Sequence, residues 1–254
     1  MTGGGQVTPG PVLFARYAYP PNALGYCGPA DSGALLEYAN GQCGDAGLVA
    51  LARQFSGAWP YLTLIAAANR QPDPLDPSVV TAYWVGSPLL ERIPGRLLAA
   101  HVVDRFTDRA GRHGTELAEL ALAGRAHHNF HVFAVYPWVG LLRAGHVEEP
   151  MRVLDSCRIR VGRVLSVHSG QVVVSSAPLC WTGRELVLGP VRPQTARLGT
   201  GPVVRAGDTV ALHWDWVCDV LDTRQAAALA HYTLSQLRVA NRALRRPVAD
   251  LVLR

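Results

Sequence analysis

The chain has 254 residues, of which 49% are hydrophobic and 17% are charged. These values predict a folded protein with a sizeable core and exclude a disordered chain or a small disulfide scaffold. Residues 1–150 hold 10 Arg against 12 acidic residues, whereas residues 151–254 hold 14 Arg against 7, so the net positive charge is C-terminal. Because these basic residues are spread out, without a stripe of stacking aromatic residues, we expect a protein partner and no nucleic acid.

Targeting and redox features favour a cytoplasmic protein. The first residues, Met1–Pro11, are rich in Gly and Pro and lack the basic and apolar regions of a secretory signal. The sequence contains no run of 18 apolar residues, so we expect no membrane-spanning helix. The five Cys residues form no C-x-x-C pair, which argues against a zinc ribbon and favours a reduced compartment.

Residues 1–150 are predicted to form a helical domain, because short apolar segments at helical spacing alternate with turns rich in Gly and Pro. The expected helical segments are Asp45 to Phe55, Tyr61 to Asn69, Ser78 to Trp84, Arg96 to Phe106, Thr115 to Leu122 and His127 to Leu142. Pro137 should kink the last of these, since proline lacks a backbone N–H.

Residues 151–254 are predicted to form a small OB-like antiparallel β-barrel followed by a C-terminal helix, which makes the fold class α+β. Apolar residues here follow a period of two and are separated by Gly turns. The expected strands are Ile159 to Val167, Gln171 to Ser176, Glu185 to Leu188 and Thr209 to Trp214, and the helix runs from Thr223 to about Ala243.

The first predicted strand of the barrel opens with a candidate metal ligand, Cys157. Three basic neighbours are expected to favour its thiolate, which is the form that binds metals: Arg158, Arg160 and Arg163. The alternative is a packed Cys that acts as a small hydrophobic residue.

The last predicted strand carries His213. Strand alternation puts His213 and Asp215 on the same face, where the carboxylate could orient the imidazole. The alternative is a strand His with an ordinary hydrogen-bond partner.

Together these segments resemble the HypC/HybG/HupF family of [NiFe]-hydrogenase assembly chaperones. The family's first strand reads Cys-x-x-x-x-Gly-Lys/Arg-Val, its last strand reads Gly-Asp-x-Val-x-x-His, and Leu-Asp/Glu opens the helix. The matching residues are Cys157, Gly162, Arg163, Val164, Gly207, Asp208, Val210, His213, Leu221 and Asp222, and the resemblance covers roughly residues 153–240.

The resemblance implies a metallochaperone that carries iron as the Fe(CN)2CO fragment between a HypD-like scaffold and the hydrogenase large subunit. Cys157 would be the iron ligand and His213 the supporting residue. A soft thiolate is a competent and exchangeable ligand for such iron. In the family the Cys follows the initiator Met, whereas 156 residues precede Cys157 here.

The segment Phe14 to Pro29 (FARYAYPPNALGYCGP) is similar to an uncharacterised actinobacterial family encoded near [NiFe]-hydrogenase genes. Within it, Gly25 and Gly28 flank Tyr26 and Cys27, which lets the backbone turn and expose the Cys27 thiol as a nucleophile or ligand. A tight turn with a packed Cys is the alternative.

The sequence His127-His128-Asn129-Phe130-His131 is a third candidate. On a helix, His127 and His131 at i and i+4 would share a face and could chelate a metal or ligate a haem. With Cys27 they would form a second iron site, supported by His128. The alternative is a set of polar residues at the N-terminal end of a buried helix, and the missing Glu excludes the H-E-x-x-H pattern of zinc proteases.

Three functional hypotheses therefore remain open. The first is a hydrogenase maturation factor that delivers iron through Cys157. The second is a metalloenzyme or an iron- or haem-binding protein that uses His127 and His131 in CO-ligand or iron supply. The third is a non-catalytic interaction scaffold. The sequence contains no nucleotide-binding motif and no α/β-hydrolase motif, so it supports neither nucleotide-dependent nor hydrolase chemistry.

Overall fold

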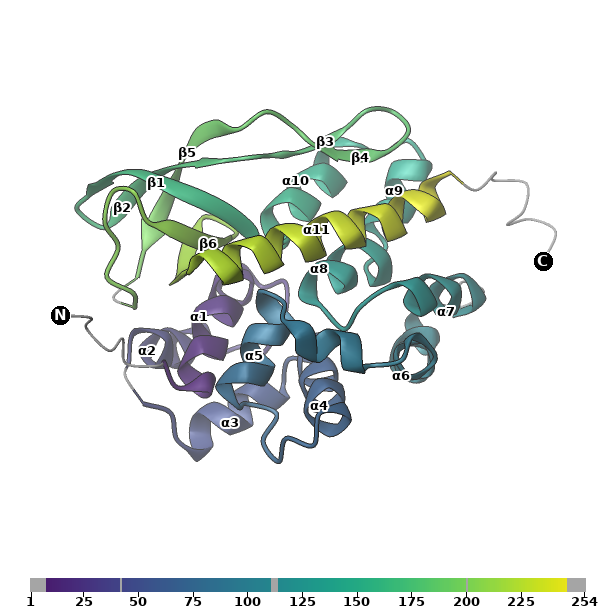
Figure 1. Ribbon diagram of the computed structural model, residues 1–254, viewed down its shortest axis with the longest axis horizontal. Coiled ribbons are helices and arrows are strands. Elements are labelled where there is room, and N and C mark those ends of the chain that lie inside the picture. Colours follow the sequence, from purple (N-terminus) through teal and green to yellow (C-terminus); the bar gives the residue numbers. More distant parts are fainter. Residues whose placement is uncertain (1–7, 42, 111–113, 200, 246–254) are drawn as a thin grey trace.

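The computed structural model describes residues 8–41, 43–110, 114–199 and 201–245. It confirms the α+β class: helices of the first half lie against a closed β-barrel, and the long helix α11 runs along both (Figure 1). The helical elements are α1 (Gly10–Ala23), α2 (Ser32–Asn40), α3 (Ala46–Arg53), α4 (Trp59–Ala68), α5 (Pro77–Trp84), η1 (Pro88–Arg92), α6 (Gly95–Ala110), α7 (Gly114–Ala123), α8 (His128–Phe130), η3 (His131–Val135), α9 (Trp138–Arg143), α10 (Glu148–Cys157) and α11 (Thr223–Leu244).

Acidic side chains cap several of these helices. Asp31, Asp45 and Asp76 accept hydrogen bonds from the first backbone N–H groups of α2, α3 and α5. Asp222 and Gln225 form a complete capping box at α11. Such caps satisfy N–H groups that have no partner inside the helix and stabilise each helix by about 1 kcal/mol.

The barrel has the strand order β1-β2-β5-β7-β6. Neighbouring strands are antiparallel except β5 and β7, which are parallel and depart from the purely antiparallel expectation. A separate two-stranded sheet pairs β3 with β4. The strands are β1 (Arg160–His168), β2 (Gln171–Ser176), β3 (Leu179–Trp181), β4 (Leu186–Leu188), β5 (Arg192–Leu198), β6 (Thr209–His213) and β7 (Trp216–Val220).

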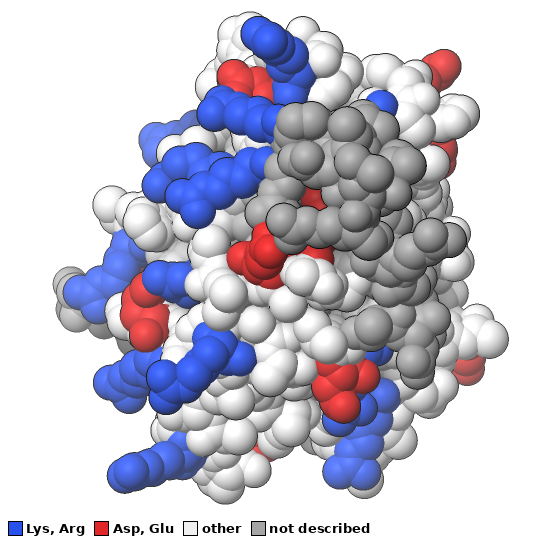
Figure 2. Space-filling model, turned by 90° about the vertical axis from the view of Figure 1, so that its right-hand side faces the viewer, with Lys and Arg blue, Asp and Glu red and all other residues white. Residues whose placement is uncertain are grey.

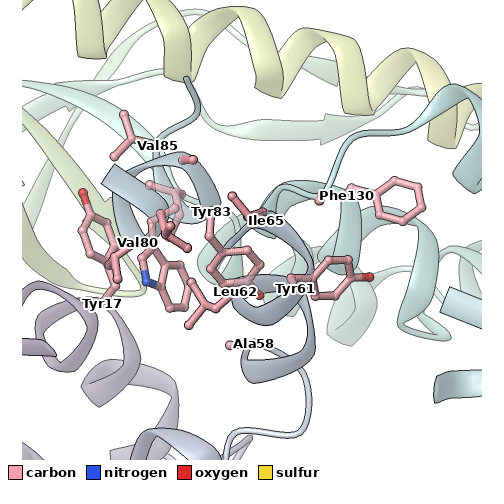
Figure 3. Packing of buried hydrophobic residues seen from close by; sticks show 14 of the residues in the cluster. Tyr17, Ala58, Tyr61, Leu62, Ile65, Val80, Tyr83, Val85 and Phe130 are labelled. Carbon is pink, nitrogen blue, oxygen red and sulfur yellow. The ribbon is translucent and has the colours of Figure 1, made fainter. Parts of the chain in front are cut away.

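The main hydrophobic core joins the two halves of the chain. It contains buried residues of the N-terminal helices, of the barrel and of α11, for example Tyr17, Tyr83, Ala211 and Leu229. Figure 3 shows its aromatic centre, where Tyr61 and Tyr83 lie side by side with ring centroids 5.7 Å apart. The predicted division at residues 150 and 151 falls inside α10, which leads directly into the barrel.

The segment expected as one helix from His127 to Leu142, kinked at Pro137, is broken at that proline, as expected, but is more irregular than a single kinked helix. The segment consists of α8, the π-helical turn η3 and α9, with the interruption between η3 and α9 at Tyr136 and Pro137. None of the described helices is both long and apolar enough to cross a membrane.

Candidate metal centre

His213 ends β6 and is fully buried. Its Nδ1 lies 2.6 Å from the backbone oxygen of Tyr17 in α1. Because a carbonyl oxygen can only accept, Nδ1 carries the ring proton and Nε2 keeps its lone pair. Nε2 is buried and makes no hydrogen bond to any described residue, so it is free to bind a metal.

The carbonyl group that orients His213 is available because of Pro21. Inside α1 the oxygen of Tyr17 would ordinarily accept from the N–H of residue 21, but proline has no N–H. The oxygen accepts from His213 instead, across 196 residues of sequence. A proline in the first helix thus fixes the tautomer of a candidate ligand near the end of the chain.

Cys157 is the last residue of α10, which corrects the expectation that it opens the first strand. The buried face of α10 has the spacing i, i+3, i+4, i+7, which turns the thiol into the interior. Its members are Pro150, Val153, Leu154 and Cys157. The side chain of Cys157 is only 6% exposed, and its Sγ lies 4.0 Å from Nε2 of His128.

The thiol of Cys157 is protonated in the metal-free protein. Burial raises its pKa well above the usual range. Arg158 pairs with the carboxylate of Asp155 at 2.8 Å, and Arg160 donates to backbone oxygens. The prediction that neighbouring arginines stabilise a thiolate is therefore wrong, and a metal would have to displace the thiol proton.

His128, expected only to support other ligands, is the third member of the group. Its Nε2 donates to the backbone oxygen of Cys157 at 2.8 Å, and its Nδ1 accepts from the hydroxyl of Tyr83 at 3.2 Å. Nε2 therefore has to give up this hydrogen bond, with the ring proton moving to Nδ1, before it can bind a metal. The ring centroid is 5.0 Å from that of His213. Burial lowers the pKa of His128 to about 4, so this imidazole is neutral at pH 7.

His128, Cys157 and His213 form a possible metal-binding triad, since one ligand atom from each lies within 4.8 Å of the other two. Tetrahedral coordination with typical Zn–N and Zn–S bond lengths needs separations of roughly 3.5 Å. A contraction of about 1 Å would therefore close the site. Two imidazoles and one thiolate suit a transition metal rather than Mg²⁺ or Ca²⁺.

A cavity of about 120 Å³ lies over the triad. Its deepest lining residues are buried: Tyr83, Trp84, His128, Cys157 and His213. Its rim includes partly exposed residues: Tyr26, Cys27, Tyr136 and Trp138. None of the described residues that line it carries a carboxylate, so the cavity offers soft ligands and aromatic walls but no general base of the Asp or Glu type.

Irregular backbone concentrates around this cavity. The π-helical turn η3 carries His131 to the cavity wall, and such turns frequently occur at functional sites. Trp214, directly after His213, has a φ of 54°, which is unusual for a residue other than Gly. The Trp214 N–H donates to the oxygen of Ser156 at 2.7 Å, which ties β6 to the end of α10.

The predicted sharing of one helical face by His127 and His131 is wrong. His127 precedes α8 in an extended conformation, and its Nδ1 accepts from the N–H of Asn129 at 3.0 Å. Its ring stacks on Tyr232, and it is not among the residues that line the cavity. His131 does line the cavity but lies beside the Tyr61 hydroxyl at 3.3 Å.

Two further predicted residues have different positions from those expected. Asp215 is exposed and pairs with Arg197 at 2.8 Å, so it does not orient His213, whose Nδ1 is held by Tyr17. Cys27 lines the same cavity as Cys157 and so does not belong to a separate site. Nothing in the sequence indicates that Tyr17, Tyr83 and Trp84 would surround the site. The only local feature that could have pointed to Tyr17 is Pro21, which lacks the N–H that would otherwise occupy the Tyr17 carbonyl.

Residues 6–247 match a protein family described as "Family of unknown function (DUF6390)". No curated protein matches the chain, and no solved structure matches it.

Proposed function

The chain belongs to DUF6390, a family without an assigned activity, and from its site we propose that it is a carrier of one transition-metal centre. The metal is iron, held by Cys157 and His213 with His128 as third ligand. In the fullest form of the proposal the cargo is an Fe(CN)2CO fragment for [NiFe]-hydrogenase assembly, exchanged with a HypD-like scaffold and the hydrogenase large subunit.

One observation carries this proposal: the Nε2 of His213 is buried without a hydrogen bond beside a buried thiol and a second imidazole. Leaving a buried polar atom unpaired costs about 1–3 kcal/mol. A metal would satisfy this atom and would use the tautomer that the Tyr17 carbonyl imposes.

The cavity favours a carrier of a ligated metal over a hydrolytic enzyme. Three protein ligands leave coordination positions open, and the cavity of about 120 Å³ adjoins the triad. It has room for several ligands the size of water, which occupies roughly 30 Å³ in the liquid. The aromatic walls suit small ligands such as CO and cyanide, and the described lining residues include no carboxylate to activate water.

The basic surface supports a protein partner. The solvent-exposed residues of α11 include Arg224, Arg238 and Arg242, whereas Arg245 at its C-terminal cap is paired with Glu185. Figure 2 shows that, on the face it draws, most of the basic side chains lie toward one edge, with some acidic side chains between them. The exposed arginines of α11 would attract an acidic protein surface during transfer.

Anaerobic purification with metal analysis and infrared spectroscopy tests the proposal. We expect stoichiometric iron in the wild type and in Cys180→Ala, a control at a half-buried thiol in β3. We expect its loss in Cys157→Ala and His213→Ala, with circular dichroism unchanged. Bands in the cyanide and carbonyl region would identify the fragment. A wild type without stoichiometric metal, or a Cys157→Ala variant that retains it, would refute the carrier function.

A further inference from the structure

Cys27 lies in a short loop after α1, between two glycines with left-handed backbone. Gly25 has a φ of 76° and Gly28 a φ of 85°, conformations that glycine adopts without strain. The loop turns the Cys27 side chain back toward the protein, where it lines the cavity over the triad.

The loop is held firmly by buried contacts. The amide nitrogen of Asn22, itself 5% exposed, donates to the backbone oxygens of Cys27 at 2.8 Å and Pro29 at 2.7 Å. A Cβ on Gly28 would lie 2.4 Å from the ring of Phe55. The position of the thiol is therefore fixed by tertiary contacts and is not a consequence of a freely moving surface turn.

The cavity consequently has one thiol at its rim and one at its base. Cys27 is half-buried and adjoins Tyr26, which is 37% exposed. Cys157 is 6% exposed, and the unpaired Nε2 of His213 lies beside it at full burial. Cys27 is absent from the group of atoms within 4.8 Å of one another, so its sulfur lies outside the triad.

We propose that Cys27 is the receiving ligand of the site: a thiophilic metal binds first to Cys27 at the rim and then passes to Cys157 at the base. This inference rests on the proposed function, and it adds the route by which the metal is loaded and released. Two thiols along one cavity allow transfer by ligand exchange without releasing the ion into water.

The transfer is balanced in protons and electrons. When the metal first binds at the rim, the Cys27 thiol releases its proton to the solvent as the bond between the metal and Cys27 Sγ forms. The bond between the metal and Cys157 Sγ forms as the bond between the metal and Cys27 Sγ breaks. The proton that leaves the Cys157 thiol is taken up by the Cys27 sulfur. The oxidation state of the metal is unchanged, and His213 and His128 then complete the coordination.

Anaerobic stopped-flow loading with Co²⁺ alone tests the receiving role, because a thiolate–cobalt charge-transfer band reports each Cys ligand. We expect Cys27→Ser to reach the wild-type final spectrum and occupancy. We expect its loading, and its extraction by a chelator, to be slower by about ten-fold or more. Cys180→Ser, at a thiol outside the cavity, should load at the wild-type rate.

A second variant isolates the first complex. In Cys157→Ser the metal should bind only weakly at the rim, giving a smaller charge-transfer band that persists only while Co²⁺ is in excess and is lost on desalting. The double variant Cys27→Ser/Cys157→Ser should lack this band altogether. Loading of Cys27→Ser at the wild-type rate would overturn the receiving role, and a loss of its final occupancy would make Cys27 a resident ligand and overturn the transfer. A wild type without any cobalt band would refute the proposed function instead.

Discussion

Acid should unfold this protein at a pH set by four buried imidazoles: His127, His128, His131 and His213. Burial lowers the pKa of His127 and His131 to about 3, that of His128 to about 4, and that of His213 well below its usual range. In the unfolded chain each imidazole takes up a proton near pH 6.5. The folded state is therefore fully stable above pH 6.5 and loses stability as the pH falls below it.

The size of this effect follows from the shifts. At pH 5 each unfolded imidazole gains about 2 kcal/mol from protonation that the folded state cannot match, and the four together give about 8 kcal/mol. Small proteins are stable by only about 5–15 kcal/mol in total. Between pH 6 and pH 5 the imidazoles alone should thus lower the free energy of unfolding by about 5 kcal/mol. The opposing titration of Asp219, whose pKa burial raises to about 6, reduces the net fall to about 4 kcal/mol.

Urea unfolding of the metal-free protein, followed by tryptophan fluorescence from pH 8 to pH 5, measures this slope. At the acid end of the range we expect the four imidazoles to take up four protons on unfolding. Asp219, whose pKa burial raises to about 6 in the folded state, should release about one, which leaves a net uptake of about three. His131→Gln should reduce this number by one, whereas His168→Gln, at an exposed position, should not change it. A pH dependence that corresponds to the uptake of fewer than two protons would show that these imidazoles are hydrated or charged in the folded state and would refute the reasoning.

Three further predictions concern single residues. Burial raises the pKa of Asp219 to about 6, so this carboxyl stabilises the folded state at pH 4 and loses that contribution as the pH rises through 6. Asp219→Asn should therefore raise the free energy of unfolding in urea by up to about 3 kcal/mol at pH 8. An equal gain at pH 4 would contradict this. Gly86→Ala should lower the stability measured by thermal unfolding by about 2–4 kcal/mol, because φ is 101° and the new Cβ would lie 2.1 Å from the ring of Tyr232. The control Gly145→Ala has a φ of 89° but no atom within 4 Å of the new Cβ, and it should lower the stability by only about 1 kcal/mol. Pro21→Ala restores a helical N–H for the carbonyl that orients the metal-binding imidazole and should weaken Co²⁺ binding by about ten-fold in a titration, so an unchanged affinity would exclude this orienting role.

The barrel was predictable where the strand pattern is local. The alternation of Gln171 to Ser176 and the hairpin turn before it predicted β2, and its register with β1 continues to His168 and Gln171. The strands β3, β5 and β7 were not predicted, because they are short or exposed and are defined by their partners rather than by their own apolar pattern. Helix α1 was also missed, because its two prolines argue against a helix. Each proline leaves one backbone carbonyl without its helical N–H partner, and the sequence does not reveal that a donor from elsewhere in the fold can replace that partner.

The site could be predicted only in part. Cys157 and His213 were placed together only through the resemblance to the assembly chaperone family, since neither local sequence alone favoured a ligand, and the structure puts them in one group. His128 was assigned a supporting role because a continuous helix would pair His127 with His131. The helix instead starts at His128, with His127 as its cap, and no local pattern reveals that the resulting turn points His128 at a thiol 29 residues away.

Acid lability and metal binding have the same physical origin. Because burial keeps His128 and His213 neutral at pH 7, neither imidazole has to lose a net charge before it coordinates a metal; only the thiol of Cys157 must give up a proton. Uptake of one metal ion at pH 7 should therefore release one proton, measured with an indicator dye in weak buffer. Release of two would mean that an imidazole is charged in the metal-free site, and the acid unfolding slope would then be correspondingly shallower. The burial that weakens the fold below pH 6.5 is thus the same burial that keeps both imidazoles neutral for metal binding. Of the two, His213 already has a free Nε2, whereas His128 has first to give up the hydrogen bond from its Nε2 to the Cys157 oxygen.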